Sequence, residues 1–514
     1  MTDTRERVLR LSSWHDDWSG LRAAVLGLGV TGFSVADTLA ELGARVRVIY
    51  GAPDADRERL LDVIGAERAC LDGDAEQLAD LQAFDPDLVI VSPGYRPDHP
   101  LTAWAEGRGI VVWGDIELGW RLRDKTDRVA DWICITGTNG KTTTTQLTAH
   151  MLLAGGLRAA PVGNIGVPIL DALRDPVGYD ALVVELSSFQ LHRLGSGPSG
   201  SPLSPYASVC LNIADDHLDW HGSAEAYVEA KGRVYENTQV ACVYNRADER
   251  TERLVEQAEV VEGARAIGFG LDTPPPSGFG LVEGILVDRG FHAARRSEAY
   301  ELVTLDELRD VGLDAPHLVQ NILAAAALAR SRGVEPAEVA GAILSFRLDP
   351  HRAQRLGESP AVPGVQWIDD SKATNAHAAD ASLRAMERVV WIVGGLLKGV
   401  DIAGLVAEHA GRLRGAVVIG ALRAEVLEAL RQHAPGVPVI EVEPGETDDT
   451  MTGAVAAAVS LARAGDTVLL SPAAASMDQF RDYADRGRRF QAAVRALGGG
   501  DAGDHHAPAG EGRG

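Results

Sequence analysis

Residues 132–143 read WICITGTNGKTT, an apolar run that leads into a glycine-rich loop and then into a predicted helix. Such a loop turns successive backbone N–H groups toward a phosphate, with Lys141 as a point charge and Thr142 as a magnesium ligand. The first glycine of the common GxxxxGK[ST] pattern would fall on Ile135. The segment therefore predicts a nucleotide-binding α/β domain of a variant class, distinct from ordinary GTPases and kinases.

Lysine is rare in this chain, since only five of the 49 lysine and arginine residues are lysines. Four of them, Lys141, Lys231, Lys372 and Lys398, lie in segments whose polar residues suggest a reaction site. Arginine cannot replace lysine where a compact charge or an amine that loses its proton is needed. Chance retention in an arginine-rich composition is the alternative, and the position of Lys141 in its loop argues against it.

The composition is that of a large globular protein. With 514 residues, 46% hydrophobic and 24% charged, the chain is long enough for three domains with separate cores. The longest apolar stretches are far shorter than a membrane span, and the first 18 residues hold no apolar signal core. We expect a cytoplasmic monomer without membrane insertion.

Charge and cysteine content narrow the possible partners. A net charge of -24 disfavours nucleic acid, which needs a dominant basic face, but small anions remain possible ligands of local lysines, helix N-termini and metal ions. The four cysteines form no CxxC pair, so neither a disulfide framework nor a zinc site is expected.

A second glycine motif, GLGVTG at residues 27–32, lies between a predicted strand and a predicted helix. It matches the dinucleotide pattern, but the next strand ends at Tyr50 without the acid that would hold a ribose. NAD is therefore disfavoured, and a turn that holds another nucleotide diphosphate is favoured. A further strand at residues 88–91 ends in a sharp turn at Gly94, which would expose backbone amides.

Strand-loop-helix units recur along the chain and predict an α/β fold with three domains. We expect a Rossmann-like N-terminal domain at residues 1–112, a central P-loop-type ATP-binding domain at 113–350, a C-terminal Rossmann-like α/β domain at 351–497 and a disordered tail at 498–514.

Polar residues follow several of the predicted strands. Glu185 comes directly after one strand, where a carboxylate would meet a magnesium-nucleotide, although an acid that caps a helix is the simpler alternative. Asp216 and His217 follow another strand, and Lys231 comes fourteen residues after His217. Taken alone, such a histidine and lysine are more often parts of a turn and of a solvated helix face.

Two polar loops follow strands of the third domain, at residues 369–375 and 394–399. They carry Lys372 and Lys398, a pair that would suit a small dicarboxylate. Either loop taken alone is equally compatible with a simple turn.

Together, the loop at 137–143, the segments at 163–166 and 185–190, and Asp216-His217-Leu218-Asp219 resemble the Mur ligases. These are ATP-dependent enzymes that add amino acids to the peptidoglycan precursor. The resemblance extends over residues 21–497, and residues 370–375, DSKATN, resemble the branch that joins D-glutamate to UDP-N-acetylmuramoyl-L-alanine.

The resemblance implies a site for each substrate and for two magnesium ions. In the family the lysine that matches Lys231 is carbamylated, so that it acts as a carboxylate. The implied contacts are, for the UDP-linked substrate, Val30, Thr31, Gly94, Asn164, Ser187 and Gln190; for ATP, Gly137, Thr138, Asn139, Gly140, Lys141, Thr142, Thr143, Asn321, Arg352 and Asp370; for D-glutamate, Lys372, Thr374, Lys398, Ser476 and Tyr483; and for magnesium, Thr142, Glu185, His217 and Lys231. Lys141, Glu185, His217 and Lys231 form the implied catalytic group.

The reaction implied by the resemblance explains the need for cations. The L-alanine carboxylate must attack the γ-phosphate of ATP, and two unit charges 4 Å apart repel by about 4 kcal/mol at an effective dielectric of 20. Lys141 and magnesium would offset this repulsion. The acyl phosphate then reacts with the amine of D-glutamate, and phosphate leaves.

Three positions depart from the family pattern. Tyr50-Gly51 stands where a polar or acidic residue is usual, Leu318 replaces the first asparagine of an HNxxN pattern, and Tyr483 stands where phenylalanine is common. They weaken single contacts and leave the class of enzyme unchanged.

Three other functions compete with this interpretation. One is a related ligase with another acceptor, such as a folylpolyglutamate synthase, against which residues 370–375 argue. Another is an NAD-dependent oxidoreductase built on residues 27–32. The third is a nucleotide-binding regulator without catalysis, which would not need Lys141, Glu185, His217 and Lys231 together.

A lysine that must react as a neutral amine predicts a specific mutant phenotype. An unperturbed lysine is neutral in about one part per thousand near pH 7.4, and metal binding could trap the carbamate that it forms. We expect Lys231→Ala to lose ligase activity and short added carboxylates to restore part of it. Near wild-type activity of Lys231→Ala or Lys231→Arg in a phosphate-release assay would contradict the carbamate.

Overall fold

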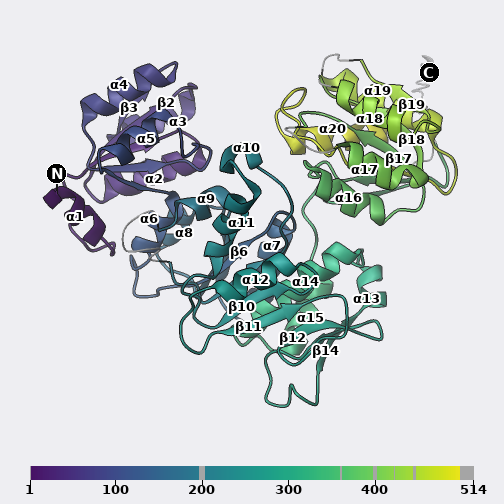
Figure 1. Ribbon diagram of the computed structural model, residues 1–514, viewed down its shortest axis with the longest axis horizontal. Coiled ribbons are helices and arrows are strands. Elements are labelled where there is room, and N and C mark those ends of the chain that lie inside the picture. The colour runs from purple at the N-terminus through teal and green to yellow at the C-terminus, as the bar shows by residue number, and fades with distance from the viewer. Residues whose placement is uncertain are drawn as a thin grey trace, which may run out of the picture. The chain divides into compact units, whose positions relative to one another are not determined.

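The computed structural model describes residues 2–195, 203–358, 362–397, 402–421, 423–443 and 447–497. Contacts between Cα atoms divide the chain into two compact units, Met1–Phe346 and Arg347–Gly514. The first unit contains two β-sheets and the second contains one (Figure 1). The expected disordered tail lies outside the described residues. Over the part of the chain that the structure describes, every helix is too short or too polar to cross a bilayer.

The first sheet has five parallel strands in the order β3-β2-β1-β4-β5. The order reverses between β1 and β4, and ligands of such folds bind outside the carboxyl ends of strands at this point. The turn at residues 27–32 follows β1 and Gly94 follows β4. The elements are β1 Arg22–Leu26, β2 Arg45–Tyr50, β3 Glu67–Cys70, β4 Leu88–Val91 and β5 Val111–Trp113, with α1 Thr2–Arg10, α2 Val30–Glu41, α3 Ala55–Ile64, α4 Asp74–Phe84 and α5 Pro100–Gly107.

Two glycines make the turn after β1 possible. Gly27 has φ 98°, a left-handed conformation that side chains disfavour. Gly32 lies in the first turn of α2, where a Cβ atom would stand 2.0 Å from the carbonyl oxygen of Gly27. The helix therefore starts closer to the strand end than any larger residue would allow.

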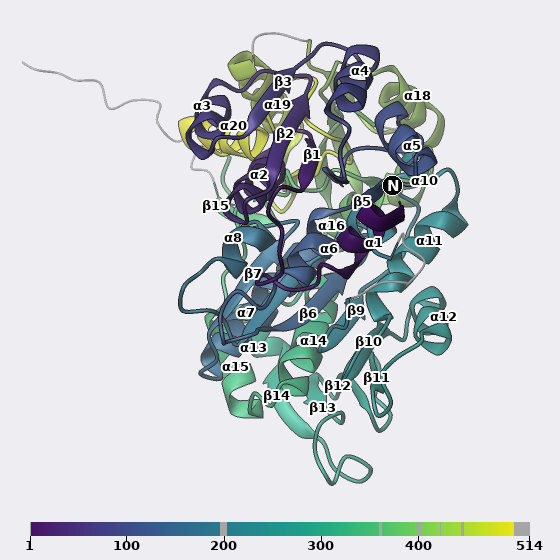
Figure 2. The same ribbon diagram turned by 90° about the vertical axis from the view of Figure 1, so that its left-hand side faces the viewer.

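The second sheet has nine strands in the order β14-β13-β12-β11-β10-β9-β6-β8-β7 (Figure 2). Strands β6 to β12 run parallel, and β13 and β14 extend one edge as antiparallel strands. The strands are β6 Asp131–Thr136, β7 Ala159–Gly163, β8 Ala181–Glu185, β9 Ala207–Cys210, β10 Ala241–Asn245, β11 Arg265–Phe269, β12 Gly278–Val282, β13 Ile285–Asp288 and β14 Tyr300–Thr304.

Helices α7, α14 and α15 pack against one another beside this sheet. Helix α14 is apolar over most of its length and is buried from Ile322 to Arg330, as expected for a helix enclosed between other elements. The helices of this region are α6 Asp115–Arg121, α7 Lys141–Ala154, α8 Ile169–Leu173, α9 Ser188–Arg193, α10 Leu218–His221, α11 Ala224–Gly232, η1 Arg233–Tyr235, α12 Glu249–Gln257, α13 Leu305–Asp310, α14 Pro316–Ser331 and α15 Pro336–Ser345.

The third sheet, in the second unit, has the order β15-β16-β20-β17-β18-β19, with β15 antiparallel and the rest parallel. Alternate residues of β17 enter two separate cores, Trp391 on one face and Ile392 on the other. The elements are β15 Gln354–Glu358, β16 Gln366–Asp369, β17 Val389–Val393, β18 Leu413–Val418, β19 Val439–Glu441, β20 Thr467–Leu470, α16 Ala376–Arg384, α17 Ile402–His409, η2 Ala410–Arg412, α18 Ala424–His433, α19 Thr447–Leu461 and α20 Tyr483–Ala496.

The predicted α/β class is confirmed, and the structure contains three sheets over the described residues. The domain boundaries expected at residues 112 and 350 stay predictions.

The close approach at Gly32 predicts that this glycine cannot be enlarged. We expect Gly32→Ala to lower the free energy of unfolding by about 1 to 3 kcal/mol, because the methyl group must push the backbone apart. Gly107→Ala is the matched control, since Gly107 is also helical and a Cβ atom there would meet nothing within 4 Å. Equal urea midpoints for the two variants would refute this packing argument.

Candidate active site

Three neighbouring parallel strands, β8, β6 and β9, end at one edge of the second sheet. The glycine-rich loop follows β6, Glu185 is the last residue of β8, and the segment with Asp216 and His217 follows β9. The carboxyl ends of parallel strands meet at one edge, so these groups surround one site.

The glycine-rich loop is fastened to the segment after β9 by the side chain and backbone of Asn212. The Asn139 N–H donates to Asn212 Oδ1 at 2.9 Å, and Asn212 Nδ2 donates to the Asn139 carbonyl at 3.1 Å. The Thr138 N–H donates to the Asn212 carbonyl at 2.9 Å. At the other end of the loop, a Cβ atom on Gly140 would stand 2.3 Å from Asn321 Oδ1, so Asn321 of α14 lies directly against the loop.

Thr138 connects this loop to α11. Its hydroxyl oxygen accepts from the Ala214 N–H at 2.9 Å and hydrogen-bonds with the Tyr227 hydroxyl at 2.9 Å. Tyr227 is 2% exposed, and the Lys231 Nζ atom lies 4.8 Å from the centre of its ring. One tyrosine thus contacts both the loop and the lysine on the next turn of its helix.

Two lysines donate to the same carbonyl oxygen. Lys141 Nζ lies 2.8 Å from the Gly137 oxygen and 3.0 Å from the Thr138 oxygen, and Lys231 Nζ lies 2.9 Å from the Gly137 oxygen. Burial, with a smaller contribution from the charge of Lys141, lowers the pKa of Lys231 to about 7. Roughly half of this amine is therefore neutral near pH 7, far more than for an exposed lysine.

Glu185 is a buried carboxylate, and only one of its two oxygens accepts a hydrogen bond among the described residues. Its Oε1 atom accepts from Asn164 Nδ2 at 3.0 Å, whereas Oε2 is buried and meets no hydrogen-bond partner among the described residues. Leaving an ionised oxygen buried and unpaired is costly, so this atom suits a metal ion.

His217 stands at the start of α10 in a left-handed conformation with φ 54°. Its ring packs on Phe189 at 4.8 Å between centroids and lies 3.6 Å from Asp216. Partial burial, together with the positive charges of Lys141 and Lys231, lowers the pKa of His217, so the ring is neutral and able to bind a metal near pH 7.

The described residues fit the implied magnesium site. Glu185 ends β8, the loop before Thr142 follows β6 and His217 lies after β9, so these groups stand at the ends of three neighbouring strands. Thr142 is the second residue of α7 and is partly exposed, next to Lys141. The Glu185 carboxylate and the Thr142 hydroxyl are oxygen donors of the kind that magnesium prefers, and the neutral imidazole of His217 would be a weaker, nitrogen ligand.

The residues predicted to bind the UDP-linked substrate fall into two groups. Val30, 56% exposed, Thr31 and Gly94 lie at the crevice of the first sheet. Ser187 and Gln190 form the capping box of α9, at the site edge of the second sheet. Gln190 is itself buried, and its amide donates to Asp115, a residue that the sequence did not single out.

In the second unit, Lys372 and Tyr483 come together from distant parts of the sequence. The Lys372 Nζ atom lies 3.8 Å from the centre of the Tyr483 ring, and the Ser371 hydroxyl donates to the Tyr483 carbonyl at 2.7 Å. Ser476 follows Ala475, whose N–H and carbonyl pair with Leu396. Lys398 lies outside the described residues.

Asp370 is buried at the end of β16, where it accepts hydrogen bonds from Ser382 Oγ at 2.6 Å, Ser471 Oγ at 3.0 Å and the Ala353 N–H at 3.1 Å. Burial raises the pKa of Asp370 to about 6. Arg352 and Thr374 are partly exposed in the flanking segments. In the second unit the structure thus gathers the predicted residues around the ends of β16 and β20.

Two buried residues missed by the sequence analysis hold this region. Arg486, fully buried, donates to the Ser371 hydroxyl at 2.9 Å, to the Ser371 carbonyl at 2.8 Å and to the Ala474 carbonyl at 3.1 Å. His351 Nδ1 lies 2.6 Å from Asp369. Arg486 occurs in the arginine-rich run RGRR, and no local pattern distinguishes it from its exposed neighbours.

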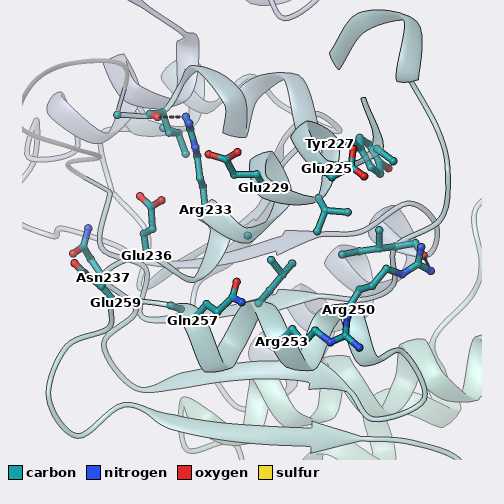
Figure 3. Close-up of a pocket in the computed structure, with 18 of the residues that line it drawn as sticks. Glu225, Tyr227, Glu229, Arg233, Glu236, Asn237, Arg250, Arg253, Gln257 and Glu259 are labelled. Atoms are coloured by element: carbon teal, nitrogen blue, oxygen red, sulfur yellow. Dashed lines mark hydrogen bonds between the residues drawn. The ribbon is translucent and has the colours of Figure 1, made fainter. Parts of the chain in front are cut away.

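A hollow of about 980 Å³ lies between α11 and α12 (Figure 3). Glu229, Arg233, Arg253 and Glu259 line it. Tyr227 and Asp215 also line it, so the hollow adjoins the candidate active site, although Lys231 is not among its lining residues.

Two family models match the chain. The Mur ligase middle domain matches residues 135–329, and the glutamate ligase domain of the Mur ligases matches residues 351–474. These matches cover the glycine-rich loop and the loops of the third sheet.

Curated relatives extend the likeness over the whole length. The UDP-N-acetylmuramoylalanine–D-glutamate ligase of Leifsonia xyli subsp. xyli is 63% identical, over 98% of this chain and 98% of that protein. The enzyme of the same name from Streptomyces avermitilis is 50% identical, over 94% of this chain and 99% of that protein.

Solved structures share the fold at low sequence identity. The UDP-N-acetylmuramate–alanine ligase MurC of Thermotoga maritima aligns with a TM-score of 0.55 and 21% identity, over 93% of this chain and 99% of that one. The MurF ligase of the same organism, solved with ADP, aligns with a TM-score of 0.51 and 17% identity, over 96% and 100%.

The contact between Tyr227 and Thr138 predicts an effect on nucleotide binding. We expect Tyr227→Phe to weaken ATP binding about fivefold, because the loop loses one buried hydrogen bond. Titration with a fluorescent ATP analogue measures this loss.

Tyr235→Phe is the matched control. The Tyr235 hydroxyl is also buried, and it joins the Cys210 N–H to the Val243 carbonyl without touching the loop. We expect this variant to be less stable by about 1 to 3 kcal/mol and to bind ATP normally. The same affinity in both variants would argue against a role of Tyr227 at the loop.

Proposed function

The chain belongs to the Mur ligase family, and we propose that it joins D-glutamate to UDP-N-acetylmuramoyl-L-alanine, converting ATP to ADP and phosphate. The observation that carries this proposal is the 63% identity, over 98% of both chains, to a relative named for this reaction. The enzyme would act in peptidoglycan precursor synthesis in the cytoplasm, as a monomer.

We place ATP on residues 137–143, with Lys141 at its phosphates. The backbone N–H groups of the loop and the start of α7 favour a phosphate there. Asn321, which lies against Gly140, would contact the nucleotide from α14. The family resemblance names Arg352 and Asp370 as further candidate ATP contacts.

Two magnesium ions would be held by Thr142, Glu185, His217 and a carbamylated Lys231. Bound magnesium supplies positive charge that offsets the phosphates as negative charge approaches. The unpaired Glu185 Oε2 atom supports this assignment.

Carbamylation of Lys231 needs a neutral amine and carbon dioxide. The Nζ atom forms a bond to the carbon of carbon dioxide and releases a proton, which leaves a carbamate. The lowered pKa of Lys231 makes the amine available near pH 7. An arginine keeps its proton and could not react in this way.

The ligation would proceed in two steps. An oxygen of the L-alanine carboxylate attacks the γ-phosphorus of ATP, and ADP leaves. The neutral amine of D-glutamate then attacks the carbonyl carbon of the acyl phosphate, the nitrogen gives up a proton to solvent, the C–O bond to the phosphate breaks, and the amide and free phosphate result. Lys141 would stabilise the negative charge on the transferring group.

The acceptor site would consist of Lys372, Thr374, Lys398, Ser476 and Tyr483. The contact of Lys372 with the Tyr483 ring holds the ammonium group by a cation–π interaction, next to the buried loop at Ser371. An ammonium group fixed in this way suits one carboxylate of D-glutamate.

Magnesium-dependent phosphate release tests the proposal. ATP and UDP-N-acetylmuramoyl-L-alanine are supplied with D-glutamate, L-glutamate, glycine or meso-diaminopimelate. We expect release with D-glutamate alone, together with the product mass of the new amide.

Phosphate release with another amino acid would support the proposed mechanism but would contradict the assignment of D-glutamate as the acceptor. No release with any of them would reject the ligase activity on this substrate and favour a folate-type substrate or a regulator.

A further inference from the structure

A chain of buried hydrogen bonds leads from Asp115 to the candidate substrate site. Gln190 Nε2 donates to Asp115 Oδ2 at 3.0 Å and lies 3.3 Å from Oδ1. The Ser187 N–H donates to Gln190 Oε1 at 3.0 Å, and the Ser187 hydroxyl donates to the same oxygen at 3.1 Å. Asp115 and Gln190 are each 3% exposed, whereas Ser187 is partly exposed.

This chain of contacts determines which way the Gln190 amide faces. The carboxylate of Asp115 can only accept, so it selects the NH₂ end of the amide. The Oε1 end then faces the two donors of Ser187. A neutral side chain at position 115 that both donates and accepts would allow the Gln190 amide to flip by about 180°. Ser187 would then lose the Oε1 atom as a fixed acceptor.

The same contact joins the two sheets of the first unit. Asp115 is the first residue of α6, which follows β5 of the first sheet. Gln190 lies on α9, which follows β8 of the second sheet in the sequence. A Cβ atom on Gly114 would stand 3.4 Å from the Cβ atom of Arg193, and the Arg193 guanidinium reaches Glu106 at 3.0 Å. Helix α9 is therefore held at the carboxyl edge of both sheets, where a substrate with a nucleotide at one end and a reacting carboxylate at the other would extend.

Stability alone does not explain a carboxylate at this position. Its side chain has no cationic partner at ion-pair distance among the described residues, and burial raises the pKa of Asp115 to about 6. Aspartate in an unfolded chain ionises near about pH 4, so above pH 6 the folded protein holds a carboxylate that lowers its stability. A residue that costs stability and orients an amide is better explained by binding.

We propose that Asp115 is a positioning residue for the UDP-linked substrate, acting through the Gln190 amide and Ser187. This inference rests on the proposed function, because that function assigns Ser187 and Gln190 to the substrate. Asp115 itself need not touch the substrate.

The test compares Asp115→Asn with the wild type at pH 8. Calorimetric titration with UDP-N-acetylmuramoyl-L-alanine in the absence of ATP measures affinity, and steady-state kinetics give KM for each of the three substrates. We expect the affinity for the UDP-linked substrate to fall about tenfold, as for the loss of one charge-assisted hydrogen bond. The KM values for ATP and D-glutamate should stay close to wild type, and the Tm should rise, because the buried charge is removed.

Glu117→Gln is the matched control on the same helix. Glu117 is also buried, but it binds Arg121 at 3.0 Å and has no contact with Gln190. We expect this variant to bind the UDP-linked substrate normally, whatever its Tm.

The Gln190→Ala background shows whether Asp115 acts through Gln190. Asp115→Asn should then have no further effect on affinity. An equal loss in both backgrounds, an unchanged affinity of Asp115→Asn, or a lower Tm with all three KM values raised would each overturn the inference. A wild type that fails to bind UDP-N-acetylmuramoyl-L-alanine would reject the proposed function itself, and with it this inference.

Discussion

The carbonyl oxygen of Gly137 accepts from two ammonium groups, those of Lys141 and Lys231. Burial lowers the pKa of Lys231, and the nearby charge of Lys141 lowers it further. The shared contact accounts for much of the site, because Lys231 can be a reactive amine while Lys141 remains the cation for phosphate. Both lysines depend on the loop backbone, which Asn212, Thr138 and Tyr227 hold in place.

Both units fix a loop in the same way, with a side chain from a distant segment that bonds to loop backbone. Asn212 does this for the glycine-rich loop, and Arg486 does it for the loop at Ser371. The loops would bind substrates; of the two residues that fasten them, Arg486 is fully buried and Asn212 is partly exposed. A fixed loop loses little entropy on binding, which favours affinity.

Much of the fold and part of the candidate site follow from the sequence, because parallel strands bring their ends together. Glycine-rich loops after apolar runs predicted the α/β class, and Lys141, Glu185 and His217 stand at adjacent strand ends, as that geometry requires. The sequence analysis did not identify Asp115, Tyr227 or Arg486, because their roles depend on contacts with partners that are distant in the sequence. The sequence separations are 75, 89 and 115 residues, respectively. No local sequence pattern indicates such contacts. The orientation of the Gln190 amide, for example, depends on Asp115, the first residue of the helix that follows β5 of another sheet.

The Oε2 atom of Glu185, which has no hydrogen-bond partner among the described residues, also affects the stability of the protein. A ligand that binds only the folded state shifts the folding equilibrium by RT ln(1 + [L]/Kd). The Glu185 Oε2 atom is buried at the carboxyl edge of the second sheet, and this desolvation lowers the stability of the fold. Divalent cation bound at this oxygen would therefore shift the folding equilibrium toward the folded state, apart from its part in the reaction.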